Sequence, residues 1–145
     1  MDINALKAEL ITDEGLVTHV YKDSRGRDTL CAGHLKTAHD HVRPGQPIPL
    51  ARCHELLAQD IQTAIAACER LWPTFDALPQ EAQHVLINVA FTLGEQKLKR
   101  FVYFHRAIEQ AKWEAAARAL EKSKWFGHVG ARGKRLVARL RGVAS

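Results

Sequence analysis

The chain has 145 residues, of which 46% are hydrophobic and 26% charged, and its formal net charge is +5. This length and composition predict one soluble globular domain that buries roughly two-thirds of its unfolded surface. No apolar run reaches the roughly 18 residues of a transmembrane helix, and an acidic start without an apolar core argues against a signal peptide. We therefore expect a protein that stays in the cytoplasm where it is made unless something else releases it.

The first predicted elements are a helix and a β-hairpin. Residues 3–13 have apolar side chains at helical spacing, and Gly15 is a natural helix stop. Residues 23–26 (Asp-Ser-Arg-Gly) are typical of a turn, because Asp closes an Asx turn and Gly adopts positive φ. Residues 17–21 and 29–32 can therefore pair as antiparallel strands.

The remainder is predicted to be mainly helical. Residues 36–49 are polar and proline-rich, which indicates a loop with at most a short third strand. Residues 50–71 keep an apolar period of about 3.6 for roughly 30 Å of helix, which Trp72-Pro73 ends. Further helices are expected at 79–93, 101–111 and 112–122, followed by an irregular stretch at 123–130 and a last amphipathic helix that carries Leu136, Val137 and Leu140 on one side.

These elements predict an α+β fold, mostly α, in a single domain at 1–145. Within it, residues 15–49 would form a small β lobe and residues 50–71 a connecting helix. Residues 72–145 would form a helical lobe, against which helix 3–13 packs.

Cysteine and histidine spacing predicts neither disulfides nor a metal site. Cys31, Cys53 and Cys68 show no CxxC pair and no disulfide framework, so free thiols are expected. Residues 39–41 (His-Asp-His) lack a further ligand at suitable spacing, which favours a polar loop over a metal site.

Positive charge is concentrated in the last third of the chain. Residues 1–96 carry 8 Lys/Arg against 13 Asp/Glu, and residues 97–145 carry 13 against 3, for net charges of −5 and +10. This asymmetry indicates either a solvated basic face or an anionic partner, such as nucleic acid, acidic lipid or an anionic cell-wall polymer. No nucleic-acid motif is present, so we expect no nucleic-acid partner.

Glu14 and Asp23 flank the first predicted strand. Glu14 lies at a helix end and Asp23 in the hairpin turn, so their carboxyls can face each other. Glycoside hydrolysis uses one acid to protonate the leaving oxygen and a second carboxylate to activate water or attack the sugar. Taken alone, the pair is better explained as two surface charges.

A longer series of motifs runs through almost the whole chain. It consists of Leu6-x-x-x-Leu10, Asp13-Glu14-Gly15-Leu16, Tyr21-x-Asp23-Ser24-x-Gly26, Thr29, Gly33-His34-Leu35, Gln59-Asp60, Leu86-Ile87-Asn88-Val89-Ala90-Phe91, Gly94-Glu95, Trp113-x-x-Ala116-Ala117, Ser123-Lys124-Trp125-Phe126 and Arg132-x-Lys134-Arg135. This series strongly resembles the phage-type lysozymes, the endolysin family. Residues 36–56 match poorly and look shortened.

The resemblance implies a lysozyme-like fold and a cofactor-independent muramidase. Glu14 matches the general acid, Asp23 the carboxylate that activates the attacking water, and Thr29 a hydroxyl that helps to hold it. An inverting reaction is implied, with the carboxyls roughly 6.5–9.5 Å apart. Because the acid must be protonated at working pH, Glu14 should lie in a drier setting than Asp23.

Further positions match family residues outside the acid pair. Leu35, Asn88 and Phe91 match positions that line or support the substrate cleft, although Phe91 fits core packing equally well. Arg132 matches an arginine that reaches the general acid across the cleft; a solvated helix charge is the alternative.

Two pairs carry structural roles in the family. His34 and Asp60 match a buried histidine–aspartate pair, and Asp13 and Arg135 match a peripheral ion pair of small energetic value.

Two stretches depart from the family pattern. Cys31 replaces a glycine, and strand alternation would place it on the Thr29 side, either as packing in the cleft floor or as a thiol near the site. Residues 127–130 are richer in glycine than usual, so substrate contacts there cannot be assigned.

The function implied by the resemblance is that of an endolysin that hydrolyses the β-1,4 bond between N-acetylmuramic acid and N-acetylglucosamine. Its partner is bacterial peptidoglycan, with anionic outer-layer polymers or lipid as further partners of the basic half, and the protein is expected to be a monomer. It would wait in the host cytoplasm until a phage membrane pore releases it.

The alternatives are a lytic transglycosylase, which needs no water-activating aspartate, and a cationic membrane-disrupting protein acting through residues 130–143.

Overall fold

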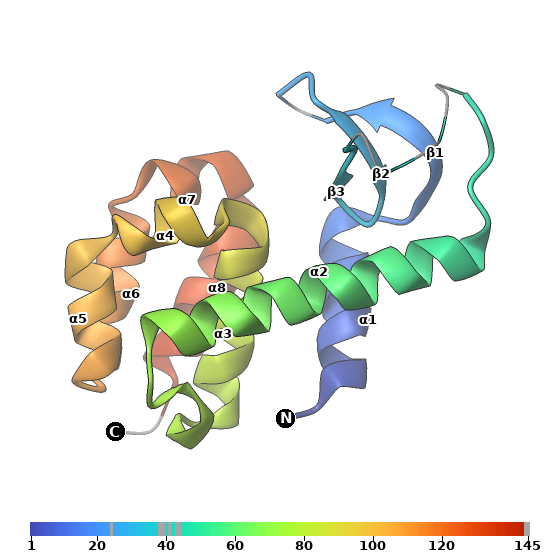
Figure 1. Cartoon of the computed structure of the whole chain (residues 1–145). Helices are drawn as coiled ribbons and strands as arrows, with labels where there is room; N and C mark the ends of the chain where they lie inside the picture. The colour runs from blue at the N-terminus through green and yellow to red at the C-terminus, as the bar shows by residue number, and fades with distance from the viewer. Residues whose placement is uncertain (24, 38–39, 41, 43–44, 144–145) are drawn as a thin grey trace. The chain divides into compact units, whose positions relative to one another are not determined.

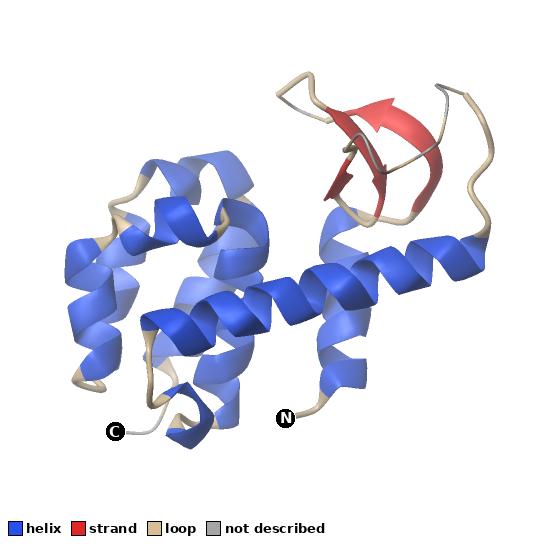
Figure 2. Ribbon diagram, viewed as in Figure 1, coloured by secondary structure: helices blue, strands red, loops and turns tan. Residues whose placement is uncertain are grey.

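The computed structural model describes residues 1–23, 25–37, 40, 42 and 45–143. It contains a small antiparallel sheet near the N-terminus and is otherwise mainly helical (Figures 1 and 2), which confirms the predicted α+β class.

The chain divides into two compact units, Asp2–Gln62 and Thr63–Ser145, Met1 belonging to the latter. The boundary falls inside the long helix, and the first helix groups with the sheet. The packing of helix 3–13 on the helical half stays a prediction.

Helix α1 spans Ile3–Glu14 and carries Glu14 at its C-terminal end. Its N-terminus is capped by Asp2, whose side chain accepts a hydrogen bond from the backbone. At the other end, Gly15 adopts φ of 73°, which a residue with a Cβ reaches only at a cost. Gly15 therefore turns the chain from the helix directly into the sheet.

The sheet consists of β1 (Val17–Lys22), β2 (Asp28–Cys31) and β3 (His34–Leu35), in the order β1-β2-β3. Both pairings are antiparallel, so the predicted hairpin is confirmed. The third strand begins before residue 36 rather than within 36–49. Tyr21 pairs with Thr29, and Thr29 pairs with Leu35. Directly opposed residues share a face, so these three side chains project from the same side of the sheet.

Helix α2 spans Leu50–Leu71, as its apolar period predicts. The start of this helix packs against the sheet through a small core of buried residues. The core consists of Leu30, Cys31, Ile48, Cys53 and Leu56, with Leu16 and Val42 partly buried against it.

A disulfide joins Cys31 at the end of β2 to Cys53 in α2, so the prediction of free thiols is wrong for this pair. The prediction that Cys31 faces the Thr29 side is also wrong. Cys31 has φ of 57°, which breaks the strand alternation and turns its side chain into the core beside Leu30. Cys68 is the buried free cysteine.

Reduction of this disulfide is expected to destabilise the Asp2–Gln62 unit. A crosslink between positions 22 residues apart limits the freedom of the unfolded chain, so its loss should cost about 3 kcal/mol. Thermal melts with and without a phosphine reductant measure the effect. A Cys53→Ala variant serves as the control, because reductant should not lower its melting temperature further. Equal melting temperatures for the oxidised and reduced wild type would contradict the prediction.

The second unit contains six further α-helices in its described residues, and one 3-10 turn, η1, at Phe75–Ala77. The helices are α3 (Gln80–Leu93), α4 (Glu95–Lys99), α5 (Val102–Glu109), α6 (Trp113–Glu121), α7 (Lys124–Val129) and α8 (Ala131–Arg141). Helix α8 packs against α3, α6 and α7, and α5 packs against α6. None of the described helices is both long and apolar enough to cross a membrane.

The prediction of an irregular stretch at 123–130 is wrong. Ser123 caps α7 by accepting a hydrogen bond from the backbone N–H of Phe126. Trp125 is buried and donates to the Thr92 hydroxyl over 2.8 Å. A cap and one tertiary anchor therefore stabilise a short helix in which Gly127 lowers the intrinsic propensity.

Candidate active site

The carboxyl group of Glu14 lies directly against the backbone of Gly33. A Cβ atom at Gly33 would come within 2.2 Å of Glu14 Oε2 and 2.8 Å of Glu14 Cδ. Gly33 also adopts φ of 72°, in the left-handed region that glycine tolerates. The tight turn between β2 and β3 therefore makes the space that the Glu14 carboxyl occupies.

Replacing Gly33 with Ala is expected to reduce activity more than stability. The new methyl group must displace the Glu14 carboxyl, and positive φ adds strain of about 1–2 kcal/mol. We expect a loss of at least about tenfold in catalytic rate. Gly26→Ala is the matched control, because Gly26 also has positive φ but has open space around it. Equal losses of activity in the two variants would show that Gly33 acts through strain alone.

Tyr21 links the two predicted catalytic acids. Burial raises the pKa of its phenol, and the charges of Glu14 and Asp23 raise it further. A hydrogen bond with the Gly33 backbone acts in the opposite direction. Glu14, Tyr21, Asp23 and Gly33 are therefore grouped closely enough to interact.

Asp23 is held firmly at the start of the hairpin turn. Its Oδ1 accepts hydrogen bonds from the backbone N–H groups of Arg25 (2.8 Å) and Arg27 (2.9 Å), which is the predicted Asx-type turn. Its Oδ2 accepts one from Arg27 Nε over 2.8 Å. These hydrogen bonds, led by the Arg27 backbone N–H, lower the pKa of Asp23, although burial acts against them. Asp23 is therefore an oriented carboxylate in its charged form.

Thr29 lies opposite Tyr21 and is only 2% exposed. Its hydroxyl donates a hydrogen bond to the backbone carbonyl of Arg27 over 2.9 Å, so the hydroxyl proton is not available to another acceptor. The oxygen still has acceptor capacity and can receive a hydrogen bond from a water molecule. Leu35, the next residue across the sheet, is 43% exposed on the same face.

The Glu14 and Asp23 side chains are both half-buried. The expectation of a drier Glu14 stays a prediction, and so does the spacing of the two carboxyls.

Asn88, Phe91 and Arg132 belong to the second unit. Asn88 is fully buried in α3, and its Oδ1 accepts a hydrogen bond from Arg132 Nε over 2.9 Å. Arg132 is thus oriented by Asn88, whereas Phe91 is half-buried. The reach of Arg132 to Glu14 and the Asp13–Arg135 ion pair both stay predictions.

His34 lies between two carboxylates. Its Nδ1 is 2.7 Å from Asp60 Oδ2, so the predicted pair is in contact, and its Nε2 is 3.0 Å from Asp40 Oδ2. Asp40 also accepts hydrogen bonds from the Thr37 backbone N–H and hydroxyl. The hydrogen bonds of this cluster join β3 to α2 and to the loop that follows β3. His39 and His41, in the stretch considered for a metal, lie outside the described residues.

The His34 cluster is expected to stabilise the fold most in mildly acidic solution. Hydrogen bonding to Asp60 raises the His34 pKa above 6.5, against the effect of burial. The stabilisation is therefore complete below the unfolded value and is lost as pH rises through the folded pKa. His34→Asn should lower the melting temperature more at about pH 5.5 than at about pH 8.5. His19→Asn, at an exposed position of β1, is the control. A pH-independent effect of His34→Asn would contradict this prediction.

Sequence reasoning missed three contributors to these sites. Tyr21 was part of a motif but had no assigned role, Arg27 was not identified, and Asp40 was considered only as part of the stretch 39–41. Tyr21 offered a signal, because in a hairpin it must lie opposite Thr29. Arg27 and Asp40 are placed by the turn and loop conformations, which their spacing alone does not reveal.

The fold and the grouped acids define a lysozyme-like protein. The phage lysozyme family matches residues 12–141, and the chain belongs to that family. Membership defines the class of activity, which is that of a lysozyme, and it confirms the resemblance seen in the sequence.

Individual relatives are distant but extend over nearly the whole chain. Two Dictyostelium discoideum proteins, the probable T4-type lysozymes 2 and 1, are 25% and 24% identical to it. Both comparisons cover 94% of this chain and 93% of the relative. The pre-baseplate central spike protein Gp5 of Enterobacteria phage T4 is 27% identical over 92% of this chain, but over only 27% of its own length.

Proposed function

We propose that this protein hydrolyses the β-1,4 bond between N-acetylmuramic acid and N-acetylglucosamine in bacterial peptidoglycan. The observation that carries the proposal is the grouping of Glu14, Tyr21, Asp23 and Gly33 in a chain of the phage lysozyme family. No cofactor takes part, because the two carboxyls supply both proton transfers.

Glu14 acts as the general acid. Its proton passes to the glycosidic oxygen as the bond to the anomeric carbon breaks. Gly33 leaves room for the Glu14 carboxyl, and the turn at Gly15 sets the direction from which it approaches. A substitution at Gly33 therefore acts directly on the acid.

Asp23 acts as the general base. Its lowered pKa keeps it ionised, so it accepts a proton from the attacking water, and Thr29 accepts a hydrogen bond from the same water. Attack on the face opposite the leaving group inverts the anomeric centre. A lytic transglycosylase has no such need for an oriented carboxylate, and the hydrogen bonds that hold Asp23 therefore favour hydrolysis.

The biological role that we propose is lysis of a bacterial host from within. The chain would accumulate in the host cytoplasm and reach the wall after a membrane pore opens. The Cys31–Cys53 disulfide suits the oxidising side of that membrane better than the reducing cytoplasm. The excess of positive charge after residue 96 would favour adhesion to anionic wall and outer-layer polymers.

The likeness to a central spike protein supports a second candidate role, local wall hydrolysis as part of a larger particle. Both roles use the same chemistry. Expression in a bacterium together with a membrane pore protein distinguishes them: rapid clearing supports the lysis role, and intact cells support the particle role.

Purified peptidoglycan tests the proposed activity directly. The protein should lower the turbidity of a wall suspension and release new reducing ends at a matching rate. Turbidity loss without reducing ends would indicate another bond or a transglycosylase. Leakage of protein-free lipid vesicles would instead indicate the membrane-disrupting alternative at residues 130–143.

A further inference from the structure

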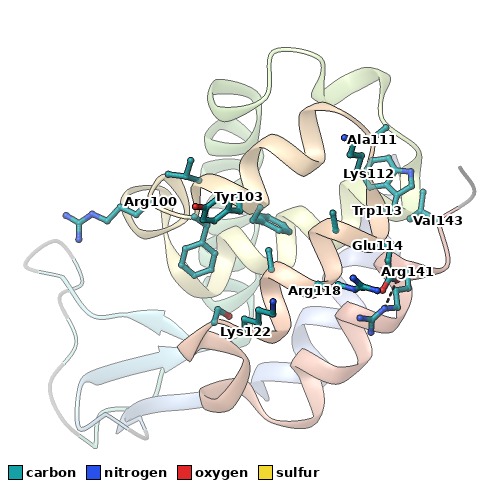
Figure 3. Close-up of a pocket in the computed structure, with 16 residues that line it drawn as sticks. Arg100, Tyr103, Ala111, Lys112, Trp113, Glu114, Arg118, Lys122, Arg141 and Val143 are labelled. Carbon is teal, nitrogen blue, oxygen red and sulfur yellow. Dashed lines mark hydrogen bonds and ion pairs between the residues drawn. The ribbon is translucent and has the colours of Figure 1, made fainter.

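An open groove lies between α5 and α6 in the second unit, and none of its lining residues has a proposed catalytic role. Its volume is about 1080 Å³, slightly above the roughly 300–1,000 Å³ that is usual for small-molecule sites. Figure 3 shows Tyr103 toward one end of the groove and Lys112, Trp113 and Val143 toward the other.

The floor of the groove is apolar. Phe104 and Trp113 are 1% and 5% exposed, so their rings form a fixed base. Ala115 and Ala119 lie one turn apart on the outer face of α6, and their small side chains leave open space above the apolar floor. We call this space the hollow. The rim adds Tyr103, which is 81% exposed and among the most exposed apolar side chains described. Exposed apolar surface around a preformed hollow is typical of a ligand site.

The rim of the groove is strongly basic. The lining residues include five cations, Arg100, Lys112, Arg118, Lys122 and Arg141, and a single carboxylate, Glu114. Glu114 is already shared by Arg118 and Arg141, at 3.1 and 2.8 Å. Among the described residues, Lys112 and Lys122 form no ion pair. Arg100 extends away from the other labelled side chains (Figure 3).

We propose that this groove binds a single acyl chain that carries an anionic head group. The chain lies over Phe104 and Trp113 in the hollow at Ala119, and the head group lies at Lys122, one turn beyond Arg118. Unpaired cations beside an apolar floor complement such an amphiphile at both ends. The site is independent of the proposed hydrolase chemistry.

Other occupants match the groove less well. The basic part of a second copy, residues 97–145 with a net charge of +10, would bring like charges together at the groove. An anionic polysaccharide needs hydrogen-bond partners for the hydroxyl groups around each sugar ring, and the uncharged polar side chains of the lining are only Tyr103, Trp113 and Ser123.

Quenching of Trp113 fluorescence by a bromine-labelled undecanoate, at monomeric concentrations, tests the proposal. We expect saturable quenching that disappears in Trp113→Phe. The corresponding neutral alcohol should bind at least about tenfold more weakly. Quenching only above the micelle concentration, or only with phosphatidylglycerol vesicles, would overturn the proposal in favour of a membrane surface. Displacement of the probe by an anionic polysaccharide would also overturn it.

Two substitutions locate the site within the groove. Ala119→Leu fills the hollow and Lys122→Glu reverses the charge, so each should weaken binding by at least about tenfold. Ala138→Leu and Lys134→Glu make the same changes at exposed positions of α8 and should leave binding unchanged. All four variants should keep the wild-type melting temperature within a few degrees, because the positions lie outside the core. Equal binding by Ala119→Leu and the wild type would overturn the proposal.

Discussion

Replacement of Glu14 by Gln is expected to reduce peptidoglycan hydrolysis by about 10²–10⁴-fold, because an amide cannot donate the proton that the leaving oxygen needs. Shape and hydrogen-bonding capacity are largely retained, so the melting temperature should change little. Initial rates of turbidity loss and of reducing-end release measure the effect.

Glu69→Gln is the matched control for the Glu14 variant. Glu69 is an exposed residue of α2, and its substitution makes the same change of charge at a residue with no proposed catalytic role. Near wild-type activity of Glu14→Gln would remove the basis for the proposed mechanism. A large fall in melting temperature would instead assign Glu14 a structural role.

Replacement of Asp23 by Asn should cause a loss of similar size, about 10²–10⁴-fold, because the amide no longer accepts a proton from water. Part of the loss reflects orientation, since Asn cannot keep both the backbone hydrogen bonds and the Arg27 contact of the carboxylate. Asp28→Asn is the control: it removes the exposed ion pair with Lys22 on the neighbouring strand, at 2.6 Å. Full activity of Asp23→Asn would favour a transglycosylase mechanism.

The acidic limb of the activity profile gives a second check on Asp23. The pKa of Asp23 is lowered from its ordinary value, chiefly by the hydrogen bond from the Arg27 backbone N–H, so we expect activity to fall at a lower pH than an ordinary aspartate would give. The contribution of Asp23 to stability has the same direction: it is present above the unfolded value and is lost as pH falls through the folded pKa. Measurement of kcat/KM against pH locates the limb.

Local signals in the sequence were sufficient for the elements that carry the acids. The apolar spacing and Gly15 predicted α1 nearly to the residue, and Asp23 at the head of the turn predicted the hairpin. The period of residues 50–71 predicted α2 with its observed bounds. In each case neighbouring residues determine the conformation, so no tertiary information was needed.

The features that were missed depend on contacts between distant parts of the chain. Cys31 and Cys53 are 22 residues apart and meet only because β2 packs on α2. Asp40 joins His34 through a loop whose conformation its composition does not reveal. Helix α7 relies on the hydrogen bond between Trp125 and Thr92, which lie in different helices.

The anomeric configuration of the first-formed product tests the central claim most directly. Proton NMR of a chitooligosaccharide or peptidoglycan-fragment digest, recorded before mutarotation, should show the α-anomer at the new reducing end. That result follows from water attack assisted by Asp23 on the face opposite the departing sugar. A β-anomer, or an anhydro ring in place of a reducing end, would contradict the proposed inverting hydrolysis.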